Sequence, residues 1–167
     1  MGGCLGMVNE VAVSSETQLQ NIFREAQSIR DHIYLYRTPS ESGKVLNFNK
    51  WNEILNFDVD NLMVIVSPGI TIGKLNEFVS QKGLRFIPGD TKYNETLSVG
   101  EWAYRGCPNL YHWKYGAGKH FVLGANYVFP NGDVASVGGR CIKNVSGYDL
   151  TRFLMGAYAD IAIGTQF

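Results

Sequence analysis

Glycines, serines and threonines recur at turn positions in the second half of the chain, where they could hold an anionic ligand. The series comprises 88–90 (PGD), 96–100 (TLSVG), 115–116 (YG), 130–133 (PNGD) and 143–150 (KNVSGYDL). Glycine lets a backbone amide approach a ligand closely because it has no Cβ atom. The ordered series predicts a chain wrapped around a large anionic cofactor.

No other arrangement of side chains predicts chemistry that this chain would perform alone. The sequence offers no Ser-His-Asp set, no paired carboxylates and no metal-ligand cluster. The 3 cysteines are an odd number without a CxxC pair, which argues against a disulfide framework or a zinc site. We therefore expect no catalytic residue and no metal ion in the chain itself, and a reducing, cytoplasmic location.

Composition and charge narrow the class of protein further. The 167 residues are 45% apolar and 18% charged, and 15 basic residues balance 15 acidic ones. A chain without net charge lacks the electrostatic footprint of a nucleic-acid or anionic-membrane binder. The longest apolar run, 62–66, is too short to span a membrane, and residues 1–7 lack the pattern of a signal peptide.

The elements that must position the turn residues follow from hydrophobic periodicity. We expect strands over 8–13, 32–38, 45–48, 54–57, 62–66, 85–87 and 159–165, helices after Ser15 and Thr71 and over 99–104 and 150–155, and a hairpin of 121–129 and 134–137. Ser15 is a predicted N-cap, with Gln18 as its capping-box partner. The first helix should bury one face: Leu19, Ile22, Phe23, Ala26 and Ile29. Asn131-Gly132 favours a tight primed turn in the hairpin. The pattern predicts an α+β fold.

Three segments together resemble a known family. Residues 46–90 (LNFNKW…FIPGD) resemble the FAD-binding domain of the vanillyl-alcohol oxidase/p-cresol methylhydroxylase (PCMH-type) flavoproteins. Residues 114–134 (KYGAGKHFVLGANYVFPNGDV) and 138–157 (GGRCIKNVSGYDLTRFLMGA) look most like the FAD-binding subunits of glycolate oxidase and related 2-hydroxyacid dehydrogenases. The likeness runs from about residue 11 to residue 166.

The resemblance implies a PCMH-type FAD-binding domain over 8–167. It implies a small mixed α/β subdomain (about 8–67), followed by a mainly antiparallel sheet subdomain with flanking helices (about 68–167), and FAD between the two. The chain would contain no cap or substrate domain. Relatives that bind FAD covalently use His or Cys, which the corresponding loop here lacks, so the resemblance implies non-covalent FAD.

The resemblance also assigns positions to the cofactor. The pyrophosphate loop falls on Arg37, Thr38, Ser40, Ser42 and Gly43, although Pro39 and Glu41 depart from the glycine-rich pattern of the family. A second contact turn falls on Ser98, Val99 and Gly100, followed by Glu101 where the family has another glycine. The remaining assigned positions are Pro88, Asp90, Tyr115, Gly116, Gly147 and Ile163. From the residues alone, Gly147 suits a helix start and Tyr115 a packed aromatic equally well.

Two functions remain open at this point. The first is the FAD-binding domain or subunit of a flavin-dependent oxidoreductase of the glycolate oxidase/2-hydroxyacid dehydrogenase type, with the substrate part supplied elsewhere. The second is a non-catalytic module that keeps the fold as a structural or interaction subunit. Pro39, Glu41 and Glu101 favour the second, and the continuous motif series favours the first. In either case we expect a second protein chain or self-association to cover the face left open, and no nucleic acid or membrane span.

Overall fold

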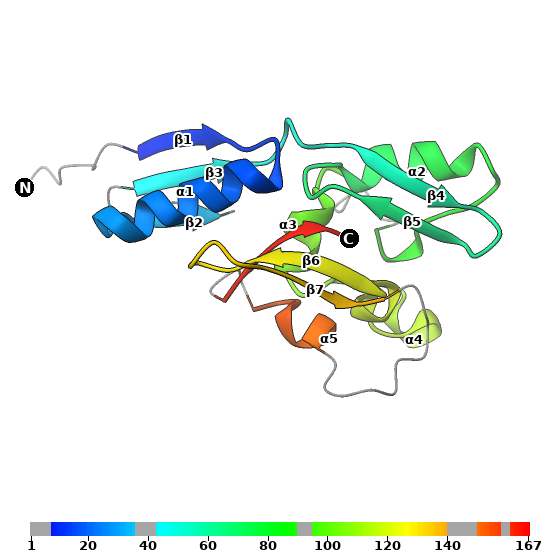
Figure 1. The fold of residues 1–167 in the computed structure, drawn as a ribbon. Helices are drawn as coiled ribbons and strands as arrows, with labels where there is room; N and C mark the ends of the chain where they lie inside the picture. The colour runs from blue at the N-terminus through cyan, green and yellow to red at the C-terminus, as the bar shows by residue number, and fades with distance from the viewer. Residues whose placement is uncertain (1–7, 36–42, 90–94, 140–149, 158–160) are drawn as a thin grey trace, which may run out of the picture.

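The structure is a computed structural model that describes residues 8–35, 43–89, 95–139, 150–157 and 161–167. Three small sheets and five helices make up the described part (Figure 1). In chain order the elements are β1 (Val8–Ala12), α1 (Glu16–Ile29), β2 (Ile33–Leu35), β3 (Gly43–Asn47), β4 (Ile54–Asp58), β5 (Met63–Val66), α2 (Ile72–Ser80), α3 (Val99–Tyr104), α4 (His112–Tyr115), β6 (Gly124–Val128), β7 (Val134–Gly138), α5 (Leu150–Leu154) and β8 (Ile163–Gln166), with 3₁₀ turns at Ile87–Gly89 and Gly118–Phe121.

The first layer is a parallel sheet of order β1-β3-β2 covered by α1. The Ser15 Oγ accepts a hydrogen bond from the Gln18 amide at 3.2 Å, as the cap predicts. The Gln18 side chain reaches back to the Ser14 amide (2.9 Å), one residue earlier than a capping box has it. The predicted buried face of α1 is confirmed except at Ile29, which is 60% exposed. Ile29 ends the helix, where Arg30 (φ 55°) turns the chain away from the core.

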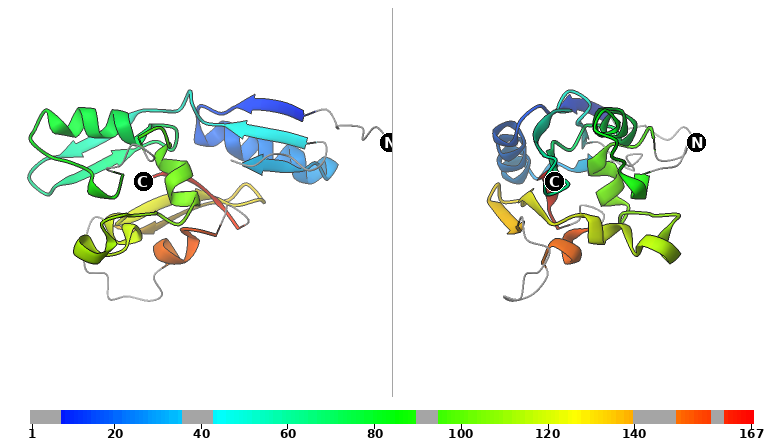
Figure 2. Two further views of the ribbon diagram at one scale, coloured as in Figure 1. Left: turned by 180° about the vertical axis from the view of Figure 1, so that it is seen from behind. Right: turned by 90° about the vertical axis from the view of Figure 1, so that its right-hand side faces the viewer.

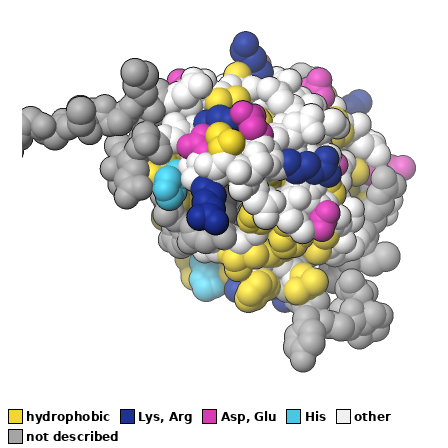
Figure 3. Space-filling view, turned by 60° about the vertical axis from the view of Figure 1, so that its left-hand side comes forward, with side chains coloured by type: hydrophobic (Ala, Val, Ile, Leu, Met, Phe, Trp, Pro, Cys, Tyr) yellow, Lys and Arg dark blue, Asp and Glu magenta, His cyan; other side chains and the backbone are white. Residues whose placement is uncertain are grey.

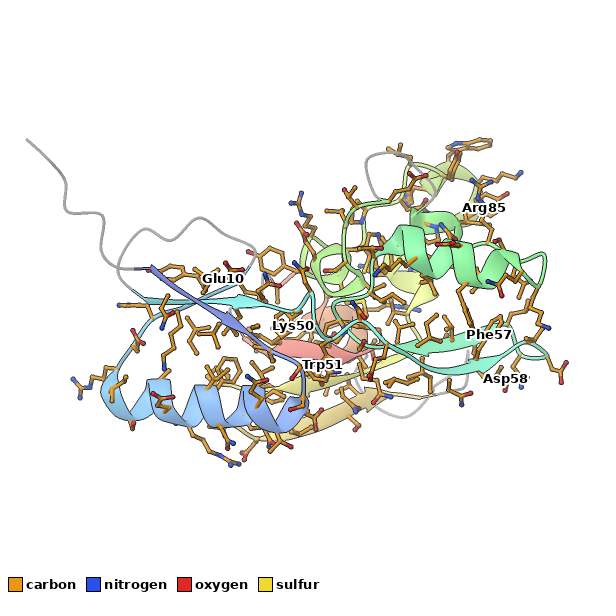
Figure 4. All side chains as sticks on the ribbon, turned by 90° about the horizontal axis from the view of Figure 1, so that it is seen from above. Glu10, Lys50, Trp51, Phe57, Asp58 and Arg85 are labelled. Carbon is orange, nitrogen blue, oxygen red and sulfur yellow. The ribbon has the colours of Figure 1, made fainter. Side chains whose placement is uncertain are left out.

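The second layer begins with the antiparallel β4–β5 hairpin, which packs with α2. Figure 4 shows Lys50 and Trp51 where the chain passes from β3 to β4, and Phe57 and Asp58 on β4. The fifth strand begins at Met63, one residue later than expected. Leu62 belongs to the preceding turn instead, with φ 54°.

The strand predicted over 85–87 is wrong. The Asn76 side-chain oxygen of α2 accepts a hydrogen bond from the Phe86 amide at 2.7 Å. That amide is therefore not available to pair with a neighbouring strand. Ile87 then starts a 3₁₀ turn. The competing hydrogen bond from a helix side chain therefore decides the local structure.

The third sheet is antiparallel, in the order β7-β6-β8. The predicted hairpin is confirmed, since β6 pairs with β7, but the prediction of a tight primed turn between them is wrong. A primed turn of this type needs positive φ at both central residues, and only Gly132 (φ 83°) has it. The Gly132 amide donates to the Phe129 carbonyl at 2.8 Å, with Pro130 between them. Proline fixes φ near −65°, which favours an ordinary turn followed by a left-handed glycine.

Two main core clusters hold the layers together. One joins α1, β2 and β3 to Val128 and Ile163 of the third sheet. The other joins the hairpin, α2 and α3 around Trp102, which is 1% exposed. Figure 2 shows the same arrangement from behind and from the side, with the C-terminus between the layers. The division of the chain near residue 67 stays a proposal; by its contacts the β4–β5 hairpin joins the second cluster.

Candidate functional site

Several predicted cofactor positions lie outside the described residues: Arg37, Thr38, Ser40, Ser42, Asp90 and Gly147. The remaining ones can be placed: Gly43, Pro88, Ser98, Val99, Gly100, Tyr115, Gly116 and Ile163.

The turn at the start of α3 has its hydrogen-bond donors engaged inside the protein. The Val99 amide donates to the Ile70 carbonyl and the Gly100 amide to the Pro68 carbonyl, both at 2.8 Å. The Ser98 Oγ accepts from the Glu101 amide at 3.1 Å and so serves as the N-cap. These groups hold α3 against the 67–70 turn. As they stand, the amides are not free to bind a phosphate.

Gly100 nevertheless lies beside another predicted position. Gly100, Ile163 of β8 and Leu35 of β2 line one small cavity of about 20 Å³. Leu35 immediately precedes residues 36–42, which include most of the predicted phosphate loop. The structure thus brings Leu35, the α3 turn and β8 to one place, at the junction of the layers.

Tyr127 of β6 lines the same cavity and was not predicted from the sequence. Its side chain is buried, and its hydroxyl has no hydrogen-bond partner within the described ranges. Burial, and to a smaller extent the nearby Cys107, raise the pKa of Tyr127, so the hydroxyl keeps its proton. A buried hydroxyl without a partner costs stability unless a water or a ligand satisfies it.

Gly43 does not join this group. Leu35 is paired with Leu46 in the parallel sheet, so Gly43 lies three residues back along β3, about 10 Å away at 3.3 Å per residue. A Cβ atom at Gly43 would lie 2.6 Å from the His32 carbonyl oxygen. In this structure the glycine serves the close packing of β2 and β3.

Pro88 and the Tyr115-Gly116 pair also lie elsewhere. Pro88 is fully buried in the 3₁₀ turn. Tyr115 is 40% exposed at the end of α4, with the Lys114 Nζ 5.0 Å from its ring centroid. The Gly116 carbonyl accepts a hydrogen bond from the Asn109 side chain at 2.8 Å. Neither Tyr115 nor Gly116 lines the cavity beside Gly100.

Charge near the α3 turn is balanced locally. Glu101, which departs from the family pattern, forms an ion pair with Arg105 one turn later, with 2.6 Å between Oε1 and Nη2. The pair reduces the negative field that Glu101 would direct at an anionic ligand.

Cys107, beside Pro108, is an inert thiol. It is buried, and burial raises its pKa to about 12, against a smaller lowering by Lys119. The thiolate is the reactive form, so a thiol with this pKa is unreactive at neutral pH. In the described part of the chain, no helix combines the length and apolar character needed to cross a membrane.

Comparisons with known proteins agree on one family. The FAD binding domain family model matches residues 10–138. Glycolate oxidase subunit GlcD of Bacillus subtilis is 36% identical over 128 residues, which are 77% of this chain and 27% of that protein. D-lactate dehydrogenase of Archaeoglobus fulgidus is 34% identical, over 77% of this chain and 28% of that protein. The chain thus spans little more than a quarter of the length of these relatives.

A solved structure shows the same fold. That of 6-hydroxy-D-nicotine oxidase from Arthrobacter nicotinovorans superposes with a TM-score of 0.79 at 20% identity, over 99% of this chain and 36% of that one. The likeness confirms the expected α+β, PCMH-type fold. The matched residues and the two relatives together show that this chain belongs to the FAD binding domain family.

Proposed function

We propose that the chain is the FAD-binding part of a flavin-dependent oxidoreductase acting on a 2-hydroxy acid. The observation that carries the proposal is the family match over residues 10–138, with relatives named glycolate oxidase subunit and D-lactate dehydrogenase. The substrate part would be supplied by polypeptide outside these 167 residues. Bound FAD would supply the redox chemistry by accepting a hydride.

The described residues fit an edge of the cofactor. The Tyr127 hydroxyl is a buried donor without an acceptor in the described residues, and Tyr127 is one of the residues that line the cavity beside Gly100. A cavity of about 20 Å³ holds a single water, so only a polar edge of FAD could reach it. Tyr127 would donate to that edge, while Gly100 leaves room beside it. We propose that the diphosphate is held by residues 37–43 and that FAD is bound non-covalently.

A second function is favoured by the hydrogen bonds of the α3 turn. The amides of Val99 and Gly100 are already bonded to protein carbonyls. Backbone amides bonded within the protein are what we expect of a module that kept the fold and no longer binds the cofactor. The alternative is a structural or interaction subunit without flavin.

The visible spectrum of the purified protein distinguishes the two functions. The oxidoreductase proposal predicts the absorption bands of oxidised flavin, either as purified or after addition of FAD and removal of the excess. A colourless protein that leaves FAD fluorescence unchanged would favour the structural subunit.

Substitution of Gly100 tests the location of the site. Gly100→Leu puts a side chain into the small cavity, so we expect loss of flavin retention. Overpacking costs about 1–3 kcal/mol, so thermal unfolding must first show that the variant is folded. Gly139→Leu is the matched control, because no atom lies within 4 Å of a Cβ atom there. If Gly100→Leu retained as much flavin as Gly139→Leu, the proposed location of the cofactor site beside Gly100 would be wrong.

A partner chain fits the exposed apolar surface. Figure 3 shows hydrophobic side chains gathered on the lower part of the left-hand face. Among exposed apolar residues, Leu150 and Phe153 of α5 are 50% and 63% exposed. Exposed apolar patches mark interaction sites in soluble proteins. We propose that a second chain, or a second copy, covers this surface, and that the protein is cytoplasmic.

A further inference from the structure

The turn between β6 and β7 carries the pair Asn131-Gly132, whose chemistry the proposed function does not use. Asn131 is exposed, whereas Gly132 is buried. An asparagine that precedes a glycine is prone to spontaneous deamidation, because glycine has no side chain to hinder the attack of its nitrogen. The surroundings of this pair in the folded protein therefore decide whether the turn is a chemically labile site.

Deamidation of Asn131 requires that two neighbouring groups meet. The Gly132 nitrogen loses its proton and attacks the side-chain carbonyl carbon of Asn131. A carbon–nitrogen bond closes a succinimide ring, and the Asn131 side-chain nitrogen leaves as ammonia. Water then opens the ring at either of its carbonyl carbons. The product is aspartate, or isoaspartate, in which the main chain runs through the former side-chain carbon, and the reaction needs no reactant besides water.

Both reacting groups are held by hydrogen bonds in the closed turn. The Gly132 amide donates its proton to the Phe129 carbonyl, with 2.8 Å between nitrogen and oxygen. The Asn131 side-chain oxygen accepts from the Asp133 amide at 3.0 Å, and the Asn131 side-chain nitrogen donates to the Asp133 carboxylate at 2.6 Å. The side chain must break both of these bonds to rotate toward Gly132. The closed turn therefore protects Asn131 from deamidation.

Helix α1 holds the turn from outside the hairpin, and Figures 1 and 2 show the tip of the hairpin next to this helix. The Gln20 side-chain nitrogen donates to the Gly132 carbonyl at 2.8 Å, and the Arg24 Nη2 lies 3.5 Å from the same oxygen. A Cβ atom at Gly132 would lie 2.8 Å from the Arg24 Nε, so this side chain covers the glycine closely. Opening of the turn around Gly132 must therefore break its contacts with α1.

We infer that Asn131 is a site of spontaneous modification that is controlled by the contact between α1 and the β6–β7 turn. Closed molecules keep the asparagine, whereas molecules in which the contact opens release ammonia and acquire a carboxylate. Surface turns open locally at a much smaller free-energy cost than global unfolding. The product lacks the amide that donates to Asp133 and places two carboxylates side by side, so the modified turn closes less readily. The modification thus records the opening of the turn and favours the open state.

The test incubates the 167-residue chain at mildly alkaline pH, folded and in urea, and follows Asn131 by mass spectrometry of its proteolytic peptide. Gln20→Ala removes the side chain that donates to Gly132. Gln27→Ala is the matched control, because Gln27 is an exposed glutamine on the same helix. Circular dichroism first shows that both variants are folded, and Gln20→Met, which keeps the size of the side chain, replaces Gln20→Ala if that variant is unfolded. Asn131→Asp supplies the standard for the aspartate product.

The folded wild type should deamidate at Asn131 more slowly than the chain in urea, by about tenfold or more, because only opened molecules react. Gln20→Ala should raise the rate in the folded state about fivefold, the factor that corresponds to one hydrogen bond of ordinary net strength. Gln27→Ala should leave that rate unchanged. Equal rates in the folded and the urea-treated wild type would overturn the proposal, because the turn would then give no protection. Equal rates in the two folded glutamine variants would overturn it as well, because α1 would then have no control over the site.

Discussion

The buried thiol of Cys107 makes the stability of this protein depend on alkaline pH. Burial raises the pKa of Cys107 from 9.0 to about 12. Above pH 9 the unfolded chain loses this proton while the folded protein still holds it. The stabilising contribution is therefore complete below pH 9 and is lost progressively as the pH rises from 9 towards 12.

The size of the effect follows from the difference between the two pKa values. One pH unit above the pKa of the unfolded state, ionisation of a single group in the unfolded chain lowers the free energy of unfolding by about 1.4 kcal/mol. The free energy of unfolding should thus fall by about 1.4 kcal/mol between pH 8 and pH 10 through Cys107 alone. The pKa of Tyr127 is also raised, but from 10.0, so its contribution begins at the upper end of this window and reaches about 0.4 kcal/mol at pH 10.

Urea unfolding at pH 8, 9 and 10, on the wild type and on Cys107→Ser, measures this contribution. Serine keeps the approximate size of the side chain and does not ionise in this range. The raised pKa of Tyr127 results mainly from burial, which both proteins share, and the folded protein keeps this proton throughout the window. The difference between the two curves therefore isolates Cys107. We expect the two free energies of unfolding to converge by about 1.4 kcal/mol across the window. Parallel curves would refute the reasoning, because they would mean that the thiol ionises equally in both states.

Two further predictions concern the junction between the layers. Gly69→Ala should reduce the free energy of unfolding by more than about 3 kcal/mol, because a Cβ atom there would lie 1.8 Å from the Phe48 carbonyl oxygen. Gly139→Ala, with open space at its Cβ position, should change it by less than about 0.5 kcal/mol in the same urea titration. Tyr127→Phe should stabilise the flavin-free protein by about 1 kcal/mol, since it removes a buried hydroxyl without a partner in the described residues. It should also weaken FAD binding in a fluorescence titration, and a destabilised flavin-free variant would show that the hydroxyl has a partner within the protein.

Elements with a local signal could be predicted from the sequence. The predicted caps Ser15 and Thr71 each accept a hydrogen bond from the amide three residues later, and each starts a helix where expected. The helix expected over 99–104 is also present, with Ser98, predicted only as a cofactor contact, as its cap. The short helix α4 could not be predicted, because it has neither a side-chain cap nor a buried residue. Residues 85–87 look like a strand from their composition, but a side chain from α2 takes the amide that a strand would need.

The candidate site was only partly predictable for the same reason. The resemblance pointed to Gly100 and Ile163, which do line one cavity. A role for Tyr127 could not be predicted from the sequence, because an aromatic residue in a hairpin strand is typical of an ordinary core position. Its hydroxyl has no hydrogen-bond partner in the described residues, and the cavity that Tyr127 lines is formed with residues of α3, α5 and β8. Only the folded chain brings these elements together. The internal bonding of the Val99 and Gly100 amides likewise depends on a turn some thirty residues earlier.

The first helix is tied to β8 and to the β6–β7 turn, which affects how the protein forms during synthesis. The Thr165 hydroxyl donates to the Glu16 carboxylate at 2.8 Å, and the Gln20 side chain donates to the Gly132 carbonyl at 2.8 Å. Such distant contacts slow folding, because a long loop must close before they form. Until residues 128–163 have been translated and have left the ribosome, the apolar side of α1 has no Val128 or Ile163 to cover it. Nascent chains should therefore depend on holding chaperones until β8 has emerged.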